Sequence, residues 1–374
     1  MFASMTSSFV TERLARHIES AHPGSSNEAM EAARRGMLDF LAVSFAGCRD
    51  PGARRLRKAL GARSQLEASV IGGAHAVDLP DAALCNGYAA HALDYDDQHG
   101  PARGHPSTVL LPALLAVCEA HRCDVSRLLE AYVVGVEVMA RLGLALGARH
   151  YEQGFHQTAT IGAIAAAASC AYLLQMDAST IENALGFAVA QASGLRFQFA
   201  SDGKPLQAGL AARAGVLAIR LAGAGIRGAS ACLDGDAGFF NAYGGDTSEP
   251  ELSVQSWGDP WQIARPGLLF KAYPCCVAAH YAAEASLRLR EEQGWPADRI
   301  STVRVSFPVN GDLALKVRSP RTGLEGRFSV EYVVALALIE GKLGVDAFAD
   351  VPIRADISAL AARVTRFLDQ ENLQ

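Results

Sequence analysis

Six acidic and imidazole side chains crowd into fifteen consecutive positions of this 374-residue chain. They are Asp94, Asp96, Asp97, His91, His99 and His105. Carboxylates and imidazoles transfer protons in enzymes and also bind metal ions. The overlapping tract GPARGHPS holds two Gly and two Pro, which predicts a loop, and reactive side chains are often carried on loops. Clustered titratable groups mark functional sites only statistically, so a solvated charged loop is the alternative interpretation.

A metal site is a second alternative for the acidic part of this tract. Carboxylates at a helix end bind Mg²⁺, and histidine combined with aspartate binds transition metals. Such a Mg²⁺ site usually recruits a second acidic cluster, and no other stretch of the sequence is comparably dense in carboxylates. We therefore expect no metal here. Asp96 and Asp97 are expected to hold the loop through backbone N–H groups, and His91 to pack within its helix.

Three further stretches pair an unusual polar residue with turn chemistry. Tyr151 and His156 lie in a loop before an Ala-rich segment, where a helix N-terminus would favour an anion. Lys204 precedes Pro205 at another expected helix start, where a cation and free N–H groups form a carboxylate site. Lys271 lies among aromatic neighbours, and desolvation there suits a base or a proton donor. A structural histidine and a solvated lysine are the ordinary alternatives for His156 and Lys204.

The composition is that of a globular protein, because half of the residues are apolar and a fifth are charged. A chain of this length exceeds the size at which one core stops growing, so two domains are expected. The formal net charge of −5, without a face dense in Lys and Arg, argues against a nucleic-acid partner. Eight scattered Cys without a CxxC pair, and no secretory leader, predict reduced thiols in the cytoplasm.

The fold is predicted to be mainly α, with a large all-helical domain over residues 1–265 and a smaller α+β lid domain over 266–374. In the first part Ala and Leu recur at helical spacing. The predicted helices there include 27–46, 79–93, 108–121, 125–146, 158–174, 179–192 and 205–224. After Pro266 we predict a helix over 275–292, a strand over 302–307 and a helix over 329–340. Residues 158–176 are long enough to cross a bilayer, but their Ala content predicts a buried helix and no membrane partner.

Two short motifs resemble sites of other protein classes. Gly223, Gly225 and Gly228 match the spacing of the dinucleotide fingerprint, but a helix precedes them where that fingerprint needs a strand, so a helix C-terminus is expected. Ser201 and Lys204 match the SxxK of penicillin-recognising acylases, whose two residues share one helical turn. Pro205 places the helix start after Ser201, so we do not expect a serine nucleophile.

Five ordered stretches together resemble one known family. HALDYDDQH with GHPS, GFHQTAT, DGKPLQAGLAAR, FKAYPCCVAAH and GRFSVEY are similar to the MmgE/PrpD family, over residues 8 to 370. That family includes 2-methylcitrate dehydratase, cis-aconitate decarboxylase and iminodisuccinate epimerase. The resemblance implies a homodimer and chemistry without a cofactor on a small polycarboxylate.

The resemblance also implies site residues. The expected catalytic residues are Asp94, His105, Tyr151 and Lys271. The expected substrate-binding residues are Arg103, His156, Lys204 and Tyr332. Lys204 and Lys271 are far from residues 91–105 in sequence, and we expect the aspartates and histidines there to need both lysines in order to carry out a reaction.

Three departures from the family pattern leave the reaction open. Gln98 stands where decarboxylase-like members carry Thr, Gln207 replaces a common His, and the sequence ends where relatives continue. A hydro-lyase similar to 2-methylcitrate dehydratase is the leading expectation. The alternatives are an epimerase, a decarboxylase, or a truncated relative that binds carboxylates without catalysis. All of the catalytic alternatives require proton transfer next to a carboxylate.

Overall fold

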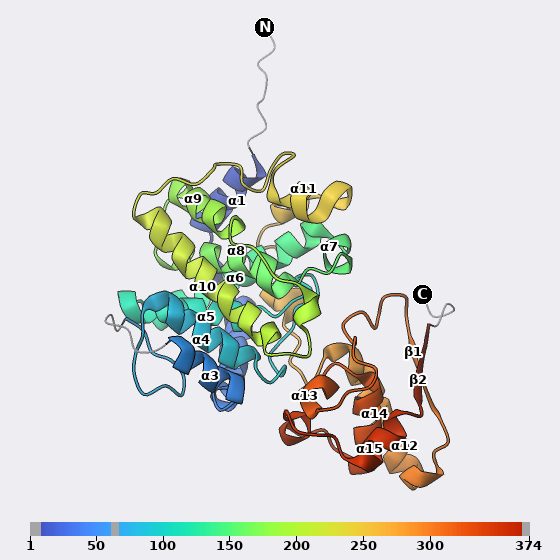
Figure 1. Cartoon of the computed structure of the whole chain (residues 1–374). Coiled ribbons are helices and arrows are strands. Elements are labelled where there is room, and N and C mark those ends of the chain that lie inside the picture. The colour runs from blue at the N-terminus through green and yellow to red at the C-terminus, as the bar shows by residue number, and fades with distance from the viewer. Residues whose placement is uncertain (1–8, 61–66, 369–374) are drawn as a thin grey trace. The chain divides into compact units, whose positions relative to one another are not determined.

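The protein consists of two compact units in the computed structural model, which describes residues 9–60 and 67–368. The helical unit comprises Asp96–Leu195, Pro205–Phe270 and the described residues up to Ala92. The mixed unit comprises Leu93–Tyr95, Arg196–Lys204 and the described residues from Lys271 onward. Figure 1 shows that helices dominate both units and that β-strands form a small sheet in the orange-to-red part of the chain. The mainly α prediction is therefore confirmed.

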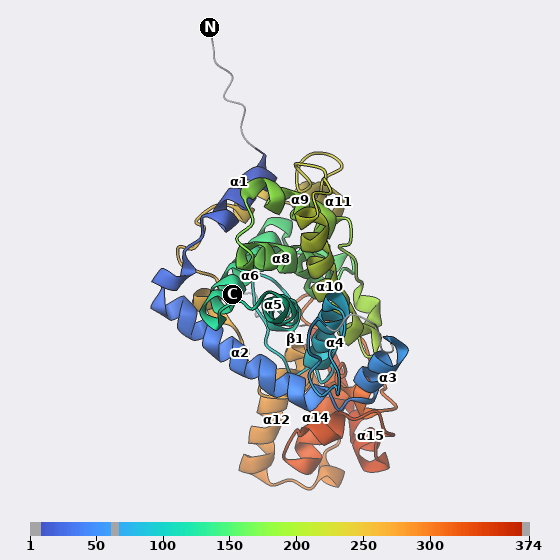
Figure 2. The same ribbon diagram turned by 90° about the vertical axis from the view of Figure 1, so that its left-hand side faces the viewer.

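The helical unit is arranged around one central helix, α5. Its helices are α1 (Val10–Glu19), α2 (Asn27–Gly47), α3 (Pro51–Leu60), α4 (Leu79–His91), α5 (Ser107–His121), α6 (Val125–Leu146), α7 (Arg149–Glu152), α8 (Gln157–Leu173), α9 (Ala178–Val189), α10 (Gly203–Gly223) and α11 (Phe239–Gly244). Figure 2 looks nearly along α5, with α2, α4, α6 and α8 around it. Ser107 to Leu114 of α5 are all buried, as expected for a helix that is apolar on every side.

Helix α8 is buried along its entire length, from Gln157 to Leu173. Its alanines and Gly162 let α5 and α6 pack closely against it, because small side chains permit close approach of helix axes. This is the buried helix that the composition of residues 158–176 predicts. Within residues 9–60 and 67–368, no helix combines the length and the apolar character that a membrane span requires.

The described part of the mixed unit contains α-helices and a two-stranded parallel sheet. Its elements are α12 (His280–Gln293), β1 (Val303–Phe307), α13 (Gly323–Gly326), α14 (Val330–Glu340), α15 (Ala355–Ala361) and β2 (Val364–Leu368). Val303 pairs with Val364, and the register continues to Phe307 and Leu368. The side chain of Arg366 in β2 is 4% exposed and donates to both carboxylate oxygens of Glu331 at 2.7 Å, which fixes the sheet to α14.

The predicted helices agree with the observed ones to within a few residues, and Val125–Leu146 agrees at both ends. The strand predicted over 302–307 is β1, whereas its partner β2 was not predicted. Helix α10 ends at Gly223, and Gly225 has a φ of 79°, so the glycine motif is a helix C-terminus as expected. The mixed unit also includes Leu93–Tyr95 and Arg196–Lys204, which come before the predicted domain boundary at residue 266.

Close packing of α4 on α10 depends on a glycine. A Cβ on Gly209 would lie 2.3 Å from the backbone oxygen of Leu84. We predict that Gly209→Ala lowers the free energy of unfolding by about 1–3 kcal/mol, because the helices must separate. Gly223→Ala is the matched control on the same helix, since its nearest neighbour would be the Cε atom of Met176 at 3.6 Å. Thermal unfolding followed by circular dichroism measures both, and equal melting temperatures would contradict this packing.

Candidate active site

The loop between α4 and α5 is held by its own backbone and by one histidine. His99 N–H donates to Gly104 O at 3.0 Å, and its Nε2 donates to Gln262 O at 2.9 Å. Gln98 exchanges two backbone hydrogen bonds with Leu269, at 2.9 and 2.8 Å. His99 is thus structural, and burial lowers its pKa. These contacts fix the backbone that carries the neighbouring aspartates and His105.

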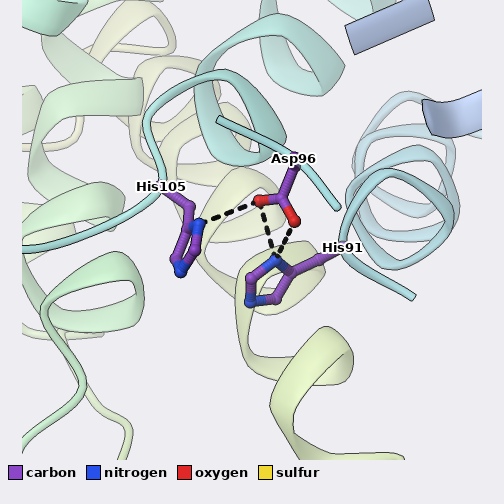
Figure 3. A group of neighbouring side chains, drawn as sticks. All are labelled: His91, Asp96 and His105. Carbon is purple, nitrogen blue, oxygen red and sulfur yellow. Dashed lines mark hydrogen bonds and ion pairs between the residues drawn. The ribbon is translucent and has the colours of Figure 1, made fainter. Parts of the chain in front are cut away.

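Asp96 is the centre of a histidine cluster, which we define as His91, Asp96, His105 and His156. The Nδ1 atom of His91 lies 2.9 and 2.8 Å from the two carboxylate oxygens of Asp96. The Nδ1 atom of His105 lies 3.2 Å from Asp96 Oδ2. Figure 3 shows the carboxylate between the two imidazoles, one from the end of α4 and one from the loop before α5. The ring centroids of His91 and His156 are 6.1 Å apart.

The charge of Asp96 is set by its two imidazole neighbours. Burial alone raises the pKa of this carboxyl, but His91 and His105 together outweigh burial and hold the pKa well below its usual value. Asp96 is therefore an anion over the whole physiological pH range. From the sequence, Asp96 is expected to bind backbone N–H groups and His91 to pack within its helix. Instead, the two side chains bind each other.

The ligand atoms of His91, Asp96 and His105 lie within 4.8 Å of one another, so the cluster could in principle hold a metal. However, His105 Nδ1 lies 2.7 Å from the backbone oxygen of Asp97. A carbonyl oxygen only accepts hydrogen bonds, so this nitrogen carries a proton and has no lone pair for a metal. The donor set therefore fits a hydrogen-bonded arrangement better than a metal centre.

Asp97, the next residue in the chain, has a raised pKa, whereas the pKa of Asp96 is lowered. Burial raises its pKa to about 8, and the nearby Asp96 and Asp39 act in the same direction against the hydrogen bonds from Ser107. Ser107 donates to Asp97 through both its backbone N–H and its Oγ, and the same Oγ contacts the hydroxyl of Tyr132. This network ties the loop to the start of α5 and to α6. It holds in place the carbonyl that binds His105.

His156 stands at the N-cap position of α8, and its side chain is turned to α10. Its backbone N–H donates to Gly194 O at 3.0 Å. Its Nδ1 lies 2.7 Å from Gln207 Oε1. His156 is buried, as are His91 and Asp96. The His156 side chain makes no capping hydrogen bond to α8 and instead meets Gln207 of α10.

The mixed unit contains a second buried polar group, which we call the lysine cluster: Asp94, Lys204 and Lys271. Lys204 Nζ forms an ion pair with Asp94 Oδ1. Lys271 Nζ lies 3.2 Å from Asp94 Oδ2 and 2.7 Å from the backbone oxygen of Asp94. The side chains are 4%, 5% and 2% exposed for Asp94, Lys204 and Lys271 respectively, so this is a buried charge cluster.

The surroundings of the lysine cluster are aromatic and thiol groups. Lys204 Nζ lies 5.4 and 5.5 Å from the ring centroids of Phe199 and Phe328, within the range of a cation–π contact. Cys275 and Cys276 lie close enough to be influenced by the charges of Asp94 and Lys271, and burial raises the pKa of both thiols. Such thiols are protonated and poor nucleophiles at neutral pH.

Arg103, Tyr151 and Tyr332 are not part of either cluster. Arg103 lies on an exposed turn with a φ of 45°, and its guanidinium makes no hydrogen bond or ion pair within residues 9–60 and 67–368. Tyr151 is half-buried in α7, beside His150, whose pKa burial lowers to about 4.

Tyr332 donates to Ala347 O at 2.5 Å and lines a cavity of about 390 Å³ inside the mixed unit. Burial raises the pKa of its phenol to about 12. Its hydroxyl is therefore a neutral donor that fastens the turn Val345–Phe348 to α14.

Comparison with known proteins matches both halves of the chain. The MmgE/PrpD N-terminal domain matches residues 12–251, and the MmgE/PrpD C-terminal domain matches residues 273–374. This chain belongs to the MmgE/PrpD family.

Its similar relatives include proteins named cis-aconitate decarboxylase. The human protein is 29% identical over 97% of this chain and 78% of its own length. The mouse protein is 31% identical over 84% of this chain and 66% of its own length. The protein of Aspergillus terreus is 27% identical over 92% of this chain and 75% of its own length. The family resemblance inferred from the five motifs is confirmed.

The state of Asp97 in this MmgE/PrpD chain predicts how stability depends on pH. Its pKa is raised on folding, so its favourable contribution is complete below the unfolded value near 4 and is lost as the pH rises towards 8. We predict that the melting temperature of Asp97→Asn rises relative to the unmodified protein between pH 5 and 9. Asp236→Asn, at an exposed position, is the control and should show no such trend. A difference independent of pH would contradict the buried, protonated state of Asp97.

The lysine cluster predicts a large loss of stability when its carboxylate is neutralised. Asp94 has a φ of 51°, which Asn tolerates, so Asp94→Asn preserves the backbone and removes the charge. Two buried ammonium groups then lack their counterion, and we expect a loss of about 3–5 kcal/mol. Glu12→Gln removes the carboxylate of an exposed pair with Arg16 and should cost less than about 1 kcal/mol. Chemical denaturation compares the two variants, and similar losses would contradict the burial of the cluster.

Proposed function

We propose that this chain is a lyase that acts on a small di- or tricarboxylate without a cofactor. The lysine cluster carries the proposal. Two ammonium groups share one carboxylate, so the three groups have a formal net charge of +1 in a buried environment. The carboxylate of a small acid offsets that charge, and the same ammonium groups stabilise negative charge that develops during the reaction. Membership of the MmgE/PrpD family and the relatives named as decarboxylases support the lyase class.

Within that class, the finer proposal is decarboxylation of an unsaturated tricarboxylate such as cis-aconitate. Lys271 Nζ contacts two oxygens of Asp94, and both contacts favour the ammonium form over the free amine. Lys271 is therefore better suited to donate a proton than to abstract one. Decarboxylation breaks a C–C bond and leaves its electron pair on the substrate, where a proton from a donor must be added. The ammonium then recovers its proton from water.

The histidine cluster supports a second candidate, in which a proton is abstracted next to a carboxylate. His105 Nδ1 carries a proton, so the neutral imidazole has its lone pair on Nε2. The Asp96 anion stabilises the imidazolium that forms when this nitrogen accepts a proton. Such a base would serve a hydro-lyase similar to 2-methylcitrate dehydratase, or an epimerase. The comparisons favour the lyase class without favouring the dehydratase. The homodimer and the cytoplasmic location stay predictions.

Incubation in D₂O with cis-aconitate, 2-methylcitrate and racemic iminodisuccinate, followed by NMR, distinguishes the candidates. A decarboxylase releases CO₂ and adds one deuteron per product molecule. A hydro-lyase forms an alkene and water, and an epimerase exchanges the α-hydrogen without net conversion of the racemate. We predict decarboxylation that persists in the presence of a chelator. Loss of activity in chelator would contradict the proposal that no metal takes part.

The lysines supply the matched variants for this experiment. We predict that Lys271→Met and Lys204→Met lower turnover by at least about a hundredfold, as expected when charge stabilisation is removed from a buried site. Lys342→Met, at an exposed position of the same unit, should retain full activity. Full activity in Lys271→Met would exclude this residue as the proton donor. A chain that binds the acids but converts none of them would support the non-catalytic alternative.

A further inference from the structure

The side chain of Gln207 is held between His156 and the backbone. Its Oε1 lies 2.7 Å from His156 Nδ1, and its Nε2 donates to Leu195 O at 3.1 Å. All three residues belong to the helical unit. Gln207 lies in the second turn of α10, and His156 immediately precedes α8. The amide therefore links two helices through a single imidazole.

The backbone at Gly194 and Leu195 determines which way the amide faces. A carbonyl oxygen accepts hydrogen bonds only, so the oxygen of Leu195 must face the NH₂ group of Gln207. That orientation places Oε1 towards His156. The neighbouring Gly194 adopts a φ of 139°, which favours glycine, and its carbonyl accepts the backbone N–H of His156. The segment Gly194–Leu195 thus holds His156 twice. Gly194 binds its backbone N–H directly, and Leu195 holds its Nδ1 through Gln207.

We propose that Gln207 is a positioning residue that fixes the tautomer of His156. An amide oxygen cannot donate a hydrogen bond, so His156 Nδ1 must carry a proton. In the neutral imidazole the lone pair is then on Nε2, which becomes the only ring nitrogen able to accept a proton or a hydrogen bond. The catalytic consequence rests on the proposed function, whereas the tautomer itself follows from the contacts alone.

In two other histidines of the same unit, backbone carbonyl groups fix the tautomer. One of them is held in the Nε2–H form and the other in the Nδ1–H form. His99 donates from Nε2 to Gln262 O, and its Nδ1 accepts the N–H of Ala102 at 3.4 Å. His105 has the reverse arrangement, with Nδ1 donating to Asp97 O. His156 resembles His105 in tautomer, but its partner is a neutral amide where His105 has the Asp96 anion as well. Gln207 therefore orients His156 without adding a charge that would stabilise its imidazolium.

NMR of the complete protein labelled with ¹⁵N in histidine tests the inference directly, because two-bond ¹H–¹⁵N spectra report which ring nitrogen carries the proton. A His156→Asn spectrum assigns the signals. In the unmodified protein we expect His156 in the Nδ1–H form. Gln207→Met keeps the length of the side chain but removes the acceptor, and we expect a mixture of tautomers or mainly Nε2–H. Gln207→Glu restores an oxygen acceptor and should restore the Nδ1–H form.

The outcomes separate this inference from the proposed function. An Nε2–H form in the unmodified protein, or an unchanged Nδ1–H form in Gln207→Met, would overturn the role of Gln207 whatever the enzyme does. If the chain is a lyase and His156 transfers a proton in its reaction, Gln207→Met should also lower kcat by about tenfold with a smaller change in KM, since the proposed carboxylate site is the lysine cluster. If no acid is converted, the NMR result still decides the tautomer, and only the lyase proposal fails.

Discussion

The buried carboxylate of Asp94 and the two ammonium groups that surround it are the constraint on which the account depends. Taking three charges out of water is costly, and the cost is tolerated only if the charges compensate one another. Here two cations share one anion, so the three groups have a formal net charge of +1. The side chain of Lys204 is further enclosed by Phe199 and Phe328, which lowers the local dielectric and strengthens any interaction with an anion. A small acid with several carboxylates is the ligand that such a site accommodates best.

Two adjacent aspartates illustrate how one loop gives different electrostatic states to the same residue type. Asp96 faces two imidazoles and is held as an anion, whereas burial raises the pKa of Asp97 and the nearby Asp96 and Asp39 act in the same direction. The backbone oxygen of Asp97 nevertheless orients His105. The loop therefore positions His105 through both the carboxylate of Asp96 and the backbone carbonyl of Asp97. The separation of pKa values between neighbouring acids is a common property of sites that transfer protons.

The helices and the importance of residues 91–105 could be predicted from the sequence, because both depend on local patterns. The spacing of apolar residues predicts both ends of α6 correctly, and the density of titratable groups indicates that the loop before α5 is functional. The partners of those groups could not be predicted, since Asp96 meets His91 and His105 only after the loop has folded. Likewise, β2 was missed because its pairing with β1 joins segments that are far apart in the sequence. Gln207 departs from the family pattern in the sequence, but its contact with His156 depends on the packing of α10 near α8, which the sequence does not show.

The most direct test of the central claim is the affinity for an unreactive tricarboxylate, measured by calorimetry with tricarballylate. Substitution of Lys204 by Met removes one cation and should weaken binding at least tenfold, because the net charge of the cluster falls from +1 to zero. Substitution of Asp94 by Asn raises that charge to +2 and should tighten binding in the protein that remains folded. Unchanged affinity in both variants would contradict the account, because it would place the bound acid away from the lysine cluster.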